Sequence, residues 1–251
     1  MRGNPSSDGI GVVTTDLLDL ATAAHGGLDR WRDVRAIDLD LSIGGAIWFV
    51  KGCPNVLRDI SMRVRTDEQS VTTTYGDRDL RTTFRPDRVT LERKDGTVLE
   101  RHEDPERAFK GNGPWSDVHV AYFSGEALWT YLNTPFVFAR DDFASEEITP
   151  IESGGEHWRR LKVIFPDSVK SHTREQIFCF GPDGLLRRHD YTVDILGGAT
   201  GLNFATGYRE AGGLLFATTR RVYAYTSNYR IVPEPVLVSI DIRNINVRRE
   251  L

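Results

Sequence analysis

The chain has 251 residues, 39% of them hydrophobic, and a net charge of −4. That length allows one sizeable core without disulfides or metal. The arginines are interspersed with Asp and Glu and form no basic stripe, which argues against a nucleic-acid partner. Cys53 and Cys179 lie in no paired motif, which excludes a disulfide scaffold or a multi-cysteine zinc site.

The N-terminal residues 1–13 are rich in Gly, Asn, Pro and Ser and predict a flexible tail. They contain no long apolar run of the kind that a signal peptide has. No later stretch approaches the roughly 18 apolar residues of a membrane-spanning helix. We therefore expect residues 14–251 to form one soluble domain, located in the cytoplasm.

Two helical regions are expected, near 15–34 and 104–133. In the first, Leu17, Leu18 and Ala21 recur at helical spacing, and Gly26-Gly27 can end a helix. In the second, a longer helix starts at Ser116 and should close the cavity described below. Its apolar positions are spaced three and four apart: Val118, Ala121, Tyr122, Gly125, Leu128, Trp129 and Leu132.

Most of the remaining chain has the period of two that indicates half-buried strands. Ile37, Leu39 and Leu41, for example, alternate with Asp38 and Asp40. Short turns separate the strands, so sequential neighbours should be antiparallel. Strands are expected near 37–43, 46–51, 57–65, 69–75, 79–84, 87–93, 97–102, 145–152, 157–165, 174–181, 185–196, 202–210, 214–226 and 236–247.

A sheet of about a dozen strands seldom stays flat, and its apolar face must be covered. The two helical regions are the available cover. The predicted fold is therefore mainly β, with a curled antiparallel sheet, or half-barrel, that wraps around helices and encloses an apolar cavity.

Four short segments are distinctive: Ala24–Trp31 (AHGGLDRW), Trp129–Phe136 (WTYLNTPF), Arg188–Tyr191 (RHDY) and Thr219–Tyr223 (TRRVY). They resemble segments of the lipoprotein-carrier fold of the LolA and LppX type, as found in many uncharacterised bacterial proteins. The resemblance implies an incomplete barrel wrapped around helices that shelters a lipid. The chain departs from the secreted carriers because it has neither a signal peptide nor a lipobox cysteine.

Motifs of the common cofactor-dependent enzymes are absent from the sequence. There is no G-x-G-x-x-G after a strand, no P-loop, no H-E-x-x-H and no G-x-S-x-G. We therefore expect no nucleotide cofactor and no metal, and any chemistry would use acid, base or electrostatic effects in a pocket.

The strand expected at 185–196 carries the first candidate site residues. His189 and Tyr191 share a parity with Leu185 and Val193, which predicts that all four face inward. An imidazole and a phenol there could exchange protons with a bound molecule, although structural hydrogen bonds, or an outward face near the middle of the strand, are the commoner explanation.

An arginine of the strand expected at 214–226 could bind a carboxylate, although pairing with Asp on a neighbouring strand is the commoner outcome. Arg220 and Arg221 lie on opposite faces of this strand, and either could serve. We take Arg221, and the hypothesis is that His189, Tyr191 and Arg221 converge on one end of the cavity.

Aromatic side chains are candidates for the ligand wall, with core packing as the default interpretation. On the long helix, His119 and Glu126 share one stripe, which we expect to face solvent rather than the cavity. His172, near a strand start, has no convincing metal-ligand spacing. The aromatic candidates are Trp48, Tyr122, Trp129, Phe178, Phe204, Tyr208 and Tyr223.

Two functions are compatible with such a cavity, and both require a hydrophobic small molecule. The first is a cofactor-independent enzyme that isomerises, cyclises or dehydrates its substrate by proton transfer and by holding a reactive conformer. The second is a non-catalytic carrier or sensor of an apolar ligand or lipid. We favour the enzyme, because a lipid carrier has little use for His, Tyr and Arg inside its cavity.

Overall fold

The computed structural model describes residues 16–110, 113–226 and 230–250. The expected tail at 1–13 lies outside them. The helices are α1 (Asp16–Ala24), α2 (Leu28–Trp31), α3 (Ala46–Val50) and α4 (Asp117–Asn133), with 3₁₀ turns η1 (Pro105–Phe109), η2 (Phe136–Ala139) and η3 (Asp194–Leu196). The strands are β1 (Ala36–Gly44), β2 (Ile60–Arg65), β3 (Val71–Tyr75), β4 (Arg81–Arg85), β5 (Arg88–Glu92), β6 (Val98–Glu103), β7 (Ala144–Ser153), β8 (Glu156–Ile164), β9 (Glu175–Phe180), β10 (Leu186–Val193), β11 (Ala199–Ala211), β12 (Leu214–Tyr225), β13 (Ile231–Val232) and β14 (Val238–Arg248).

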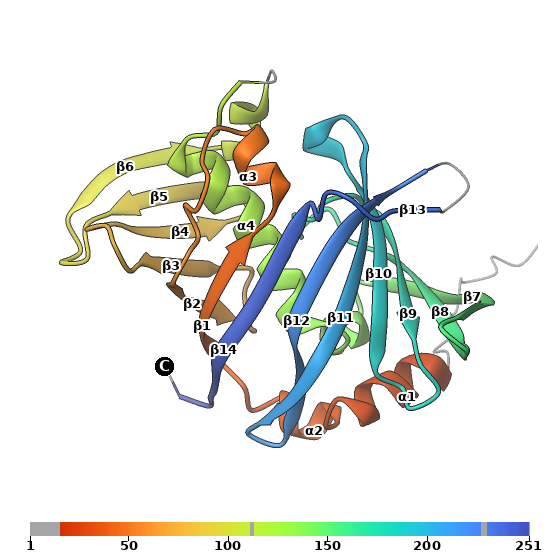
Figure 1. The fold of residues 1–251 in the computed structure, drawn as a ribbon. Coiled ribbons are helices and arrows are strands. Elements are labelled where there is room, and N and C mark those ends of the chain that lie inside the picture. The colour runs from red at the N-terminus through yellow and green to blue at the C-terminus, as the bar shows by residue number, and fades with distance from the viewer. Residues whose placement is uncertain (1–15, 111–112, 227–229, 251) are drawn as a thin grey trace, which may run out of the picture.

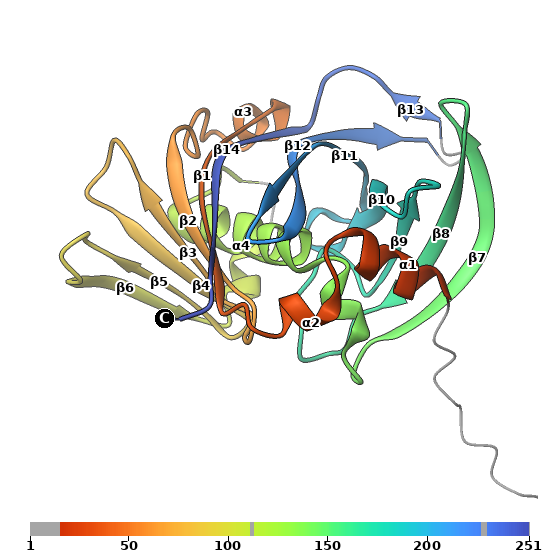
Figure 2. The same cartoon turned by 90° about the horizontal axis from the view of Figure 1, so that it is seen from below.

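The strands form one antiparallel sheet in the order β6-β5-β4-β3-β2-β1-β14-β12-β11-β10-β9-β8-β7, with β13 paired to β12. Near its middle, β1 pairs with β14, from Ala36 opposite Arg248 to Gly44 opposite Ser239. The sheet curls, but its edge strands β6 and β7 do not meet (Figures 1 and 2). The predicted half-barrel, mainly β with helical cover, is confirmed.

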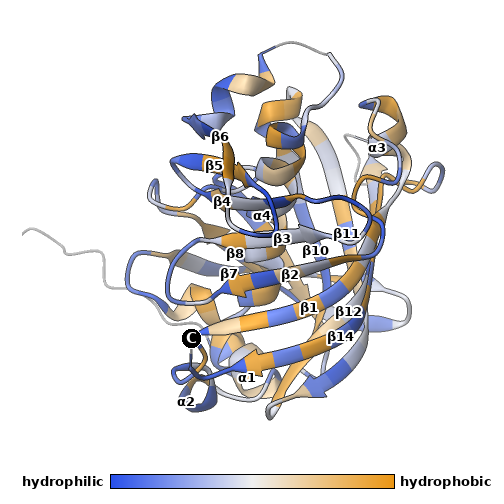
Figure 3. Cartoon of the chain, turned by 90° about the vertical axis from the view of Figure 1, so that its left-hand side faces the viewer, coloured by the Kyte–Doolittle hydropathy of each residue, from blue (hydrophilic) through white to orange (hydrophobic). Residues whose placement is uncertain are grey.

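The alternation that predicted β1 separates its two faces. Ile37 and Leu41 are fully buried on the inner face, and Figure 3 shows the alternating bands of hydropathy along β1 and β14. On the outer face Asp38 accepts two hydrogen bonds from Arg63 on β2, at 2.7 and 2.9 Å, and one from Arg248 on β14 at 2.8 Å. The arginines of this part of the sheet thus neutralise carboxylates on neighbouring strands.

Helix α4 lies on the inner side of the curved sheet, with strands of both halves around it (Figures 1 and 2). Its side chains are buried from Val120 to Asn133 without interruption. Ser116 and His119 form a capping box at its start. No helix among the described residues is long and apolar enough to cross a membrane.

Gly125 lets α4 approach β4 closely. A Cβ atom at this position would lie only 2.5 Å from the Cβ and Cγ atoms of Phe84, which is itself buried. Gly125→Ala should therefore lower the free energy of unfolding by about 1–3 kcal/mol through overpacking, despite the higher helix propensity of Ala.

The matched control for this change is Gly113→Ala, since a Cβ there meets nothing within 4 Å. Chemical denaturation of both variants gives the comparison. Equal or greater stability of Gly125→Ala would show that α4 and β4 are not in this close contact.

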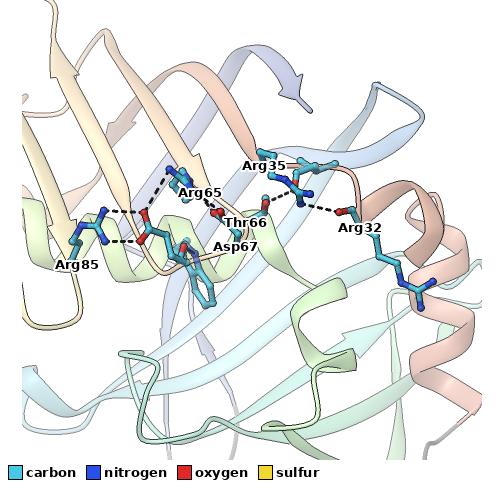
Figure 4. Close-up of polar contacts among 9 residues, drawn as sticks. Arg32, Arg35, Arg65, Thr66, Asp67 and Arg85 are labelled. Carbon is cyan, nitrogen blue, oxygen red and sulfur yellow. Dashed lines mark hydrogen bonds and ion pairs between the residues drawn. The ribbon is translucent and has the colours of Figure 1, made fainter. Parts of the chain in front are cut away.

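The turn between β2 and β3 fastens α4 to the sheet. Arg65 pairs with Asp67, and Arg85 on β4 donates two hydrogen bonds to Glu68, at 2.6 and 2.9 Å (Figure 4). The backbone carbonyl of Glu68 accepts a hydrogen bond from the indole of Trp129, at 3.0 Å. The ion pairs thus fix the turn at Asp67 and Glu68, whose backbone accepts the hydrogen bond from Trp129.

The strand predicted at 46–51 is wrong, because Ala46–Val50 form helix α3. The run is apolar throughout and too short for its period to separate a helix from a strand. Gly45, with φ 112°, turns the chain at this point, and a Cβ there would lie 2.4 Å from the carbonyl oxygen of Leu237. Trp48 points inward, whereas Phe49 and Val50 are 66% and 79% exposed.

Candidate functional site

An apolar pocket of about 320 Å³ lies beside α3. Figure 1 shows α3 at one end of the half-barrel. Helix α3 lies on one side of it, the inner faces of β10, β11 and β12 on another, and the segment before β14 completes it. The volume is at the lower end of the range of about 300–1,000 Å³ that ligand pockets occupy. Its apolar wall includes Ile47, Phe123, Val193, Ala199, Val222 and Leu237.

Two smaller spaces lie inside the half-barrel. The first, about 20 Å³, shares Tyr191 with the pocket and is also lined by Tyr131 of α4. The second, about 10 Å³, is lined by Tyr131, Tyr208 and Arg220. Each is about large enough for one water molecule. Tyr191 thus borders the pocket and the first small space, and Tyr131 borders both small spaces.

The two tyrosines between these spaces contact each other. The hydroxyl groups of Tyr131 and Tyr191 are 2.9 Å apart and form a hydrogen bond. Burial raises the pKa of both groups, so both remain protonated. Gly201 on β11 makes room for the Tyr191 ring, because a Cβ there would lie 2.7 Å from it.

His189 lies one inward position deeper than Tyr191 on β10. Its ring stacks on Phe178 with centroids 4.1 Å apart, and its Nε2 forms a 2.5 Å hydrogen bond with Gln176 Oε1. Burial, followed by the charges of Arg220 and His172, holds the pKa of His189 well below its ordinary value. The ring is therefore neutral, and Nε2 is the donor because an amide oxygen only accepts.

His189 and Tyr191 point inward, as predicted, but Leu185 does not share their face. The pairing of β10 with β9 shifts between Leu186 and Arg188, so Leu186, rather than Leu185, lines the interior. Such an irregularity reverses the parity of the residues before it. Val193, beyond the shift, indicates the face correctly.

Arg221 does not join His189 and Tyr191. It lies on the outer face of β12, where it donates a 2.8 Å hydrogen bond to Asp241 of β14. Its neighbour Arg220 points inward, is 5% exposed, and lies over the ring of Tyr131 at 4.6 Å. The predicted convergence thus holds for the histidine and the tyrosine and fails for the arginine. The apolar residue Val222, which shares a face with Arg220, is the sequence signal that indicates the inward arginine.

Glu126 does not face solvent, which corrects the expectation for its helix stripe. It is 2% exposed and accepts a 2.8 Å hydrogen bond from Nδ1 of His172, which is also buried. His172 lines the first small space beside Tyr191. His119 is half-buried and donates from Nε2 to the carbonyl of Ala108 at 2.8 Å. The stripe was assigned to solvent because α4 was expected to have one exposed face.

The aromatic candidates fall into three groups. Trp48 and Tyr208 line the two small spaces, and Phe178 supports His189. Tyr122 and Trp129 are buried between α4 and the β2–β5 part of the sheet, away from the pocket. The third group does not reach the interior: Phe204 and Tyr223 pair across strands on the face opposite to Asn203 and Val222, with ring centroids 6.0 Å apart.

Comparisons with known proteins agree with this architecture. No family model and no curated protein matches the chain. Among solved structures, a LolA superfamily protein from Nitrosomonas europaea has a TM-score of 0.52 at 10% identity, over 94% of this chain and 93% of that one. A putative outer membrane lipoprotein-sorting protein domain from Vibrio parahaemolyticus has a TM-score of 0.52 at 9% identity, over 93% of each chain. The chain therefore has the LolA-like lipoprotein-carrier fold.

These comparisons overturn the preference for an enzyme. Both proteins share the fold along nearly their whole length. One is described as a LolA superfamily protein and the other as a putative lipoprotein-sorting domain, and neither description is that of an enzyme. The site agrees, since His189 is packed between Phe178 and Tyr131 and is held neutral. The interpretation as an isomerase, cyclase or dehydratase was wrong.

Proposed function

We propose that this protein is a non-catalytic carrier that binds an apolar or lipid-like ligand in the pocket beside α3. The observation that carries the proposal is the pocket itself, about 320 Å³ in volume and lined mainly by aliphatic and aromatic side chains. Burying a hydrocarbon chain there contributes about 0.8 kcal/mol for each methylene removed from water.

The rim of the pocket supports the proposal. Val50 of α3 is part of the pocket lining and, with its neighbour Phe49, remains largely exposed. Large apolar side chains gathered at a pocket entrance are typical of a surface that contacts a ligand or a partner. Helix α3 is also short, with five residues, and its connection to the barrel passes through Gly45.

Filling the pocket should abolish binding. Ala199→Trp places an indole at the inner-face start of β11, where Ala199 lines the pocket and is exposed. We expect the affinity for the neutral fluorescent probe 1-N-phenylnaphthylamine to fall by about tenfold or more, because the apolar area available to the probe is lost.

Thr206→Trp is the matched control, since Thr206 is exposed on the same strand and lies outside the pocket lining. Both variants and the wild type are titrated with the probe after removal of bound lipid. Absence of probe binding to the wild type, or equal binding by Ala199→Trp and Thr206→Trp, would refute the proposed carrier site.

A further inference from the structure

Arg220 is a buried cation for which the described residues supply no carboxylate. The other buried arginine of this region, Arg188, shows how the fold neutralises such a charge. Arg188 donates two hydrogen bonds to the buried carboxylate of Asp190, at 2.6 and 2.8 Å. Burial of a charge is costly unless the charge is paired. Among the described residues, Arg220 therefore lacks the buried carboxylate partner that Arg188 has in Asp190.

The hydrogen bonds of Arg220 are also incomplete. Its Nη2 donates to the carbonyl of Tyr131 at a long 3.3 Å, and its Nη1 has no hydrogen-bond partner among the described residues. A guanidinium has five N–H donors in a rigid fork that matches a carboxylate. The ring of Tyr131 offers a cation–π contact but accepts no hydrogen bond from Nη1.

Asn203 repeats the pattern on the adjacent strand. It is fully buried, and within the described part of the chain neither its amide nitrogen nor its amide oxygen has a hydrogen bond of ordinary geometry. Its register partners are His189 on β10 and Val222 on β12. Val222 lines the apolar pocket, so Asn203 is the cross-strand neighbour of a pocket residue, although it does not itself line the pocket.

Arg220 lies on the same inner face of β12 as Val222 and two residues before it, so the two positions are about 6–7 Å apart along the strand. Gly201, which lines the pocket, stands in the same relation to Asn203 on β11. An apolar tier near the rim is thus followed by a polar tier deeper in the barrel. Tyr191 lines the apolar pocket, and its hydrogen-bond partner Tyr131 lines the small space beside Arg220.

We propose that the carried ligand is a single-chain amphiphile with a carboxylate head group, of the fatty-acid class. Its hydrocarbon chain fills the apolar pocket, and its head group is bound by Arg220, Asn203 and the hydroxyl pair. This inference rests on the proposed carrier function and adds the class and the orientation of the ligand.

The charge of the site favours a carboxylate over a phosphate monoester. Arg220 supplies one positive charge, and the neighbouring His189 is held neutral. The buried Glu126 forms its hydrogen bond with His172, and no ion pair in the described part of the chain joins it to Arg220. One cation matches one monovalent anion, whereas a doubly charged phosphate would retain an unpaired charge. The small pocket also fits one hydrocarbon chain better than two.

The test is displacement of 1-N-phenylnaphthylamine by palmitate, hexadecanol and hexadecyl phosphate at pH 8, with the delipidated full chain. The wild type should bind palmitate about 10- to 100-fold more tightly than hexadecanol, the effect of a hydrogen bond to a charged group. Palmitate should also bind more tightly than hexadecyl phosphate. Arg220→Met should lose the preference for palmitate over hexadecanol and still bind the neutral probe.

Two matched variants locate the effect. Arg221→Met makes the same change one residue along, where the side chain is outside the barrel, and should keep the preference. Lys51→Met removes the cation at the pocket rim and should keep it too. If Lys51→Met loses the preference and Arg220→Met keeps it, the head group lies at the rim and the inference is wrong.

The remaining outcomes distinguish failure of the head-group site from failure of the carrier function. Equal binding of palmitate and hexadecanol by the wild type would refute a carboxylate site, and tighter binding of hexadecyl phosphate would assign the site to phosphate instead. If Arg220→Met does not fold, Asn203→Leu is used with the same expectation of a reduced preference. Failure of the neutral probe to bind would count against the carrier itself, whereas probe binding without acid preference counts only against the head-group site.

Discussion

Replacing Trp129 by Ala is expected to lower the free energy of unfolding by about 3–5 kcal/mol, the range for truncating a large buried aromatic side chain. Trp129 is 0% exposed and is the largest fully buried side chain among the described residues. It lies on α4, which is enclosed by the sheet and cannot move to refill the space. The measurement is urea unfolding at equilibrium. The dependence of the unfolding free energy on urea concentration should be the same in the variant and the wild type if the unfolded state is unchanged.

Trp129→Phe separates packing from hydrogen bonding. The indole Nε1 donates to the carbonyl of Glu68, and Phe leaves that buried acceptor unpaired while keeping much of the ring volume. We expect Trp129→Phe to cost about 1–3 kcal/mol. A cost below about 1 kcal/mol for Trp129→Ala would mean that α4 is not the centre of the core.

The strands were predictable because their residues alternate. In β1, Ile37 and Leu41 face a core while Asp38 and Asp40 face water, and a shift by one residue would reverse every side chain. The same alternation of apolar and polar residues predicts β14 and the short hairpins before β6. The turns between sequential strands then fixed the antiparallel order, and the curl followed from the number of strands.

The pairing of β1 with β14 is a different kind of contact. It joins Ala36 to Arg248, and no local signal in either strand specifies a partner about 200 residues away. Short apolar runs fail for another reason, as α3 shows. In Ala46–Val50 every residue is apolar, so the pattern contains no polar position from which a period can be measured.

The polar interior was predictable in kind and only partly in detail. Alternation placed His189 and Tyr191 inside, but the choice between Arg220 and Arg221 depended on which face of β12 was judged inward. The aromatic face of Arg221 and Tyr223 was chosen, whereas the aliphatic Val222 marks the interior. Glu126 was missed because its partner, His172, is 46 residues away in sequence.

The choice of enzyme over carrier rested on residue types alone. A buried His, Tyr and Arg can perform catalysis only if a substrate atom can reach them. In the fold, His189 stacks on Phe178, donates to Gln176, and lines neither the pocket nor the two small spaces. Side-chain packing of this kind is decided by strands that are far apart in sequence.

The stability of the protein is expected to fall as the pH is lowered from 7 to 5, before most carboxylates are protonated. Burial lowers the pKa of His25 to about 4, although its hydrogen bond to the carbonyl of Ala21 opposes the shift. The pKa of His189 is lowered in the same direction, again mainly by burial. The unfolded chain, with ordinary histidine pKa values near ~6.5, therefore binds protons that the folded chain does not.

This difference in proton binding determines that stability falls, rather than rises, as the pH is lowered. Above about pH 6.5 both states carry neutral histidines, and the stability is fully present. Below that value each such histidine destabilises the fold by about 1.4 kcal/mol per pH unit, until the folded pKa is reached. For His25 the window runs from about pH 6.5 to about pH 4. Between pH 7 and pH 5 it should cost roughly 2 kcal/mol, and His189 should add to that loss.

Denaturant unfolding of the wild type and of His25→Phe at several pH values between 5 and 8 measures this dependence. Phe keeps an aromatic ring against Phe136, Phe180 and Tyr208, the three rings that His25 now contacts edge-on. The variant should lose roughly 2 kcal/mol less than the wild type between pH 7 and pH 5. An identical slope in both proteins would mean that His25 is protonated in the folded state, and that its ring is not shielded from water between α1 and the barrel.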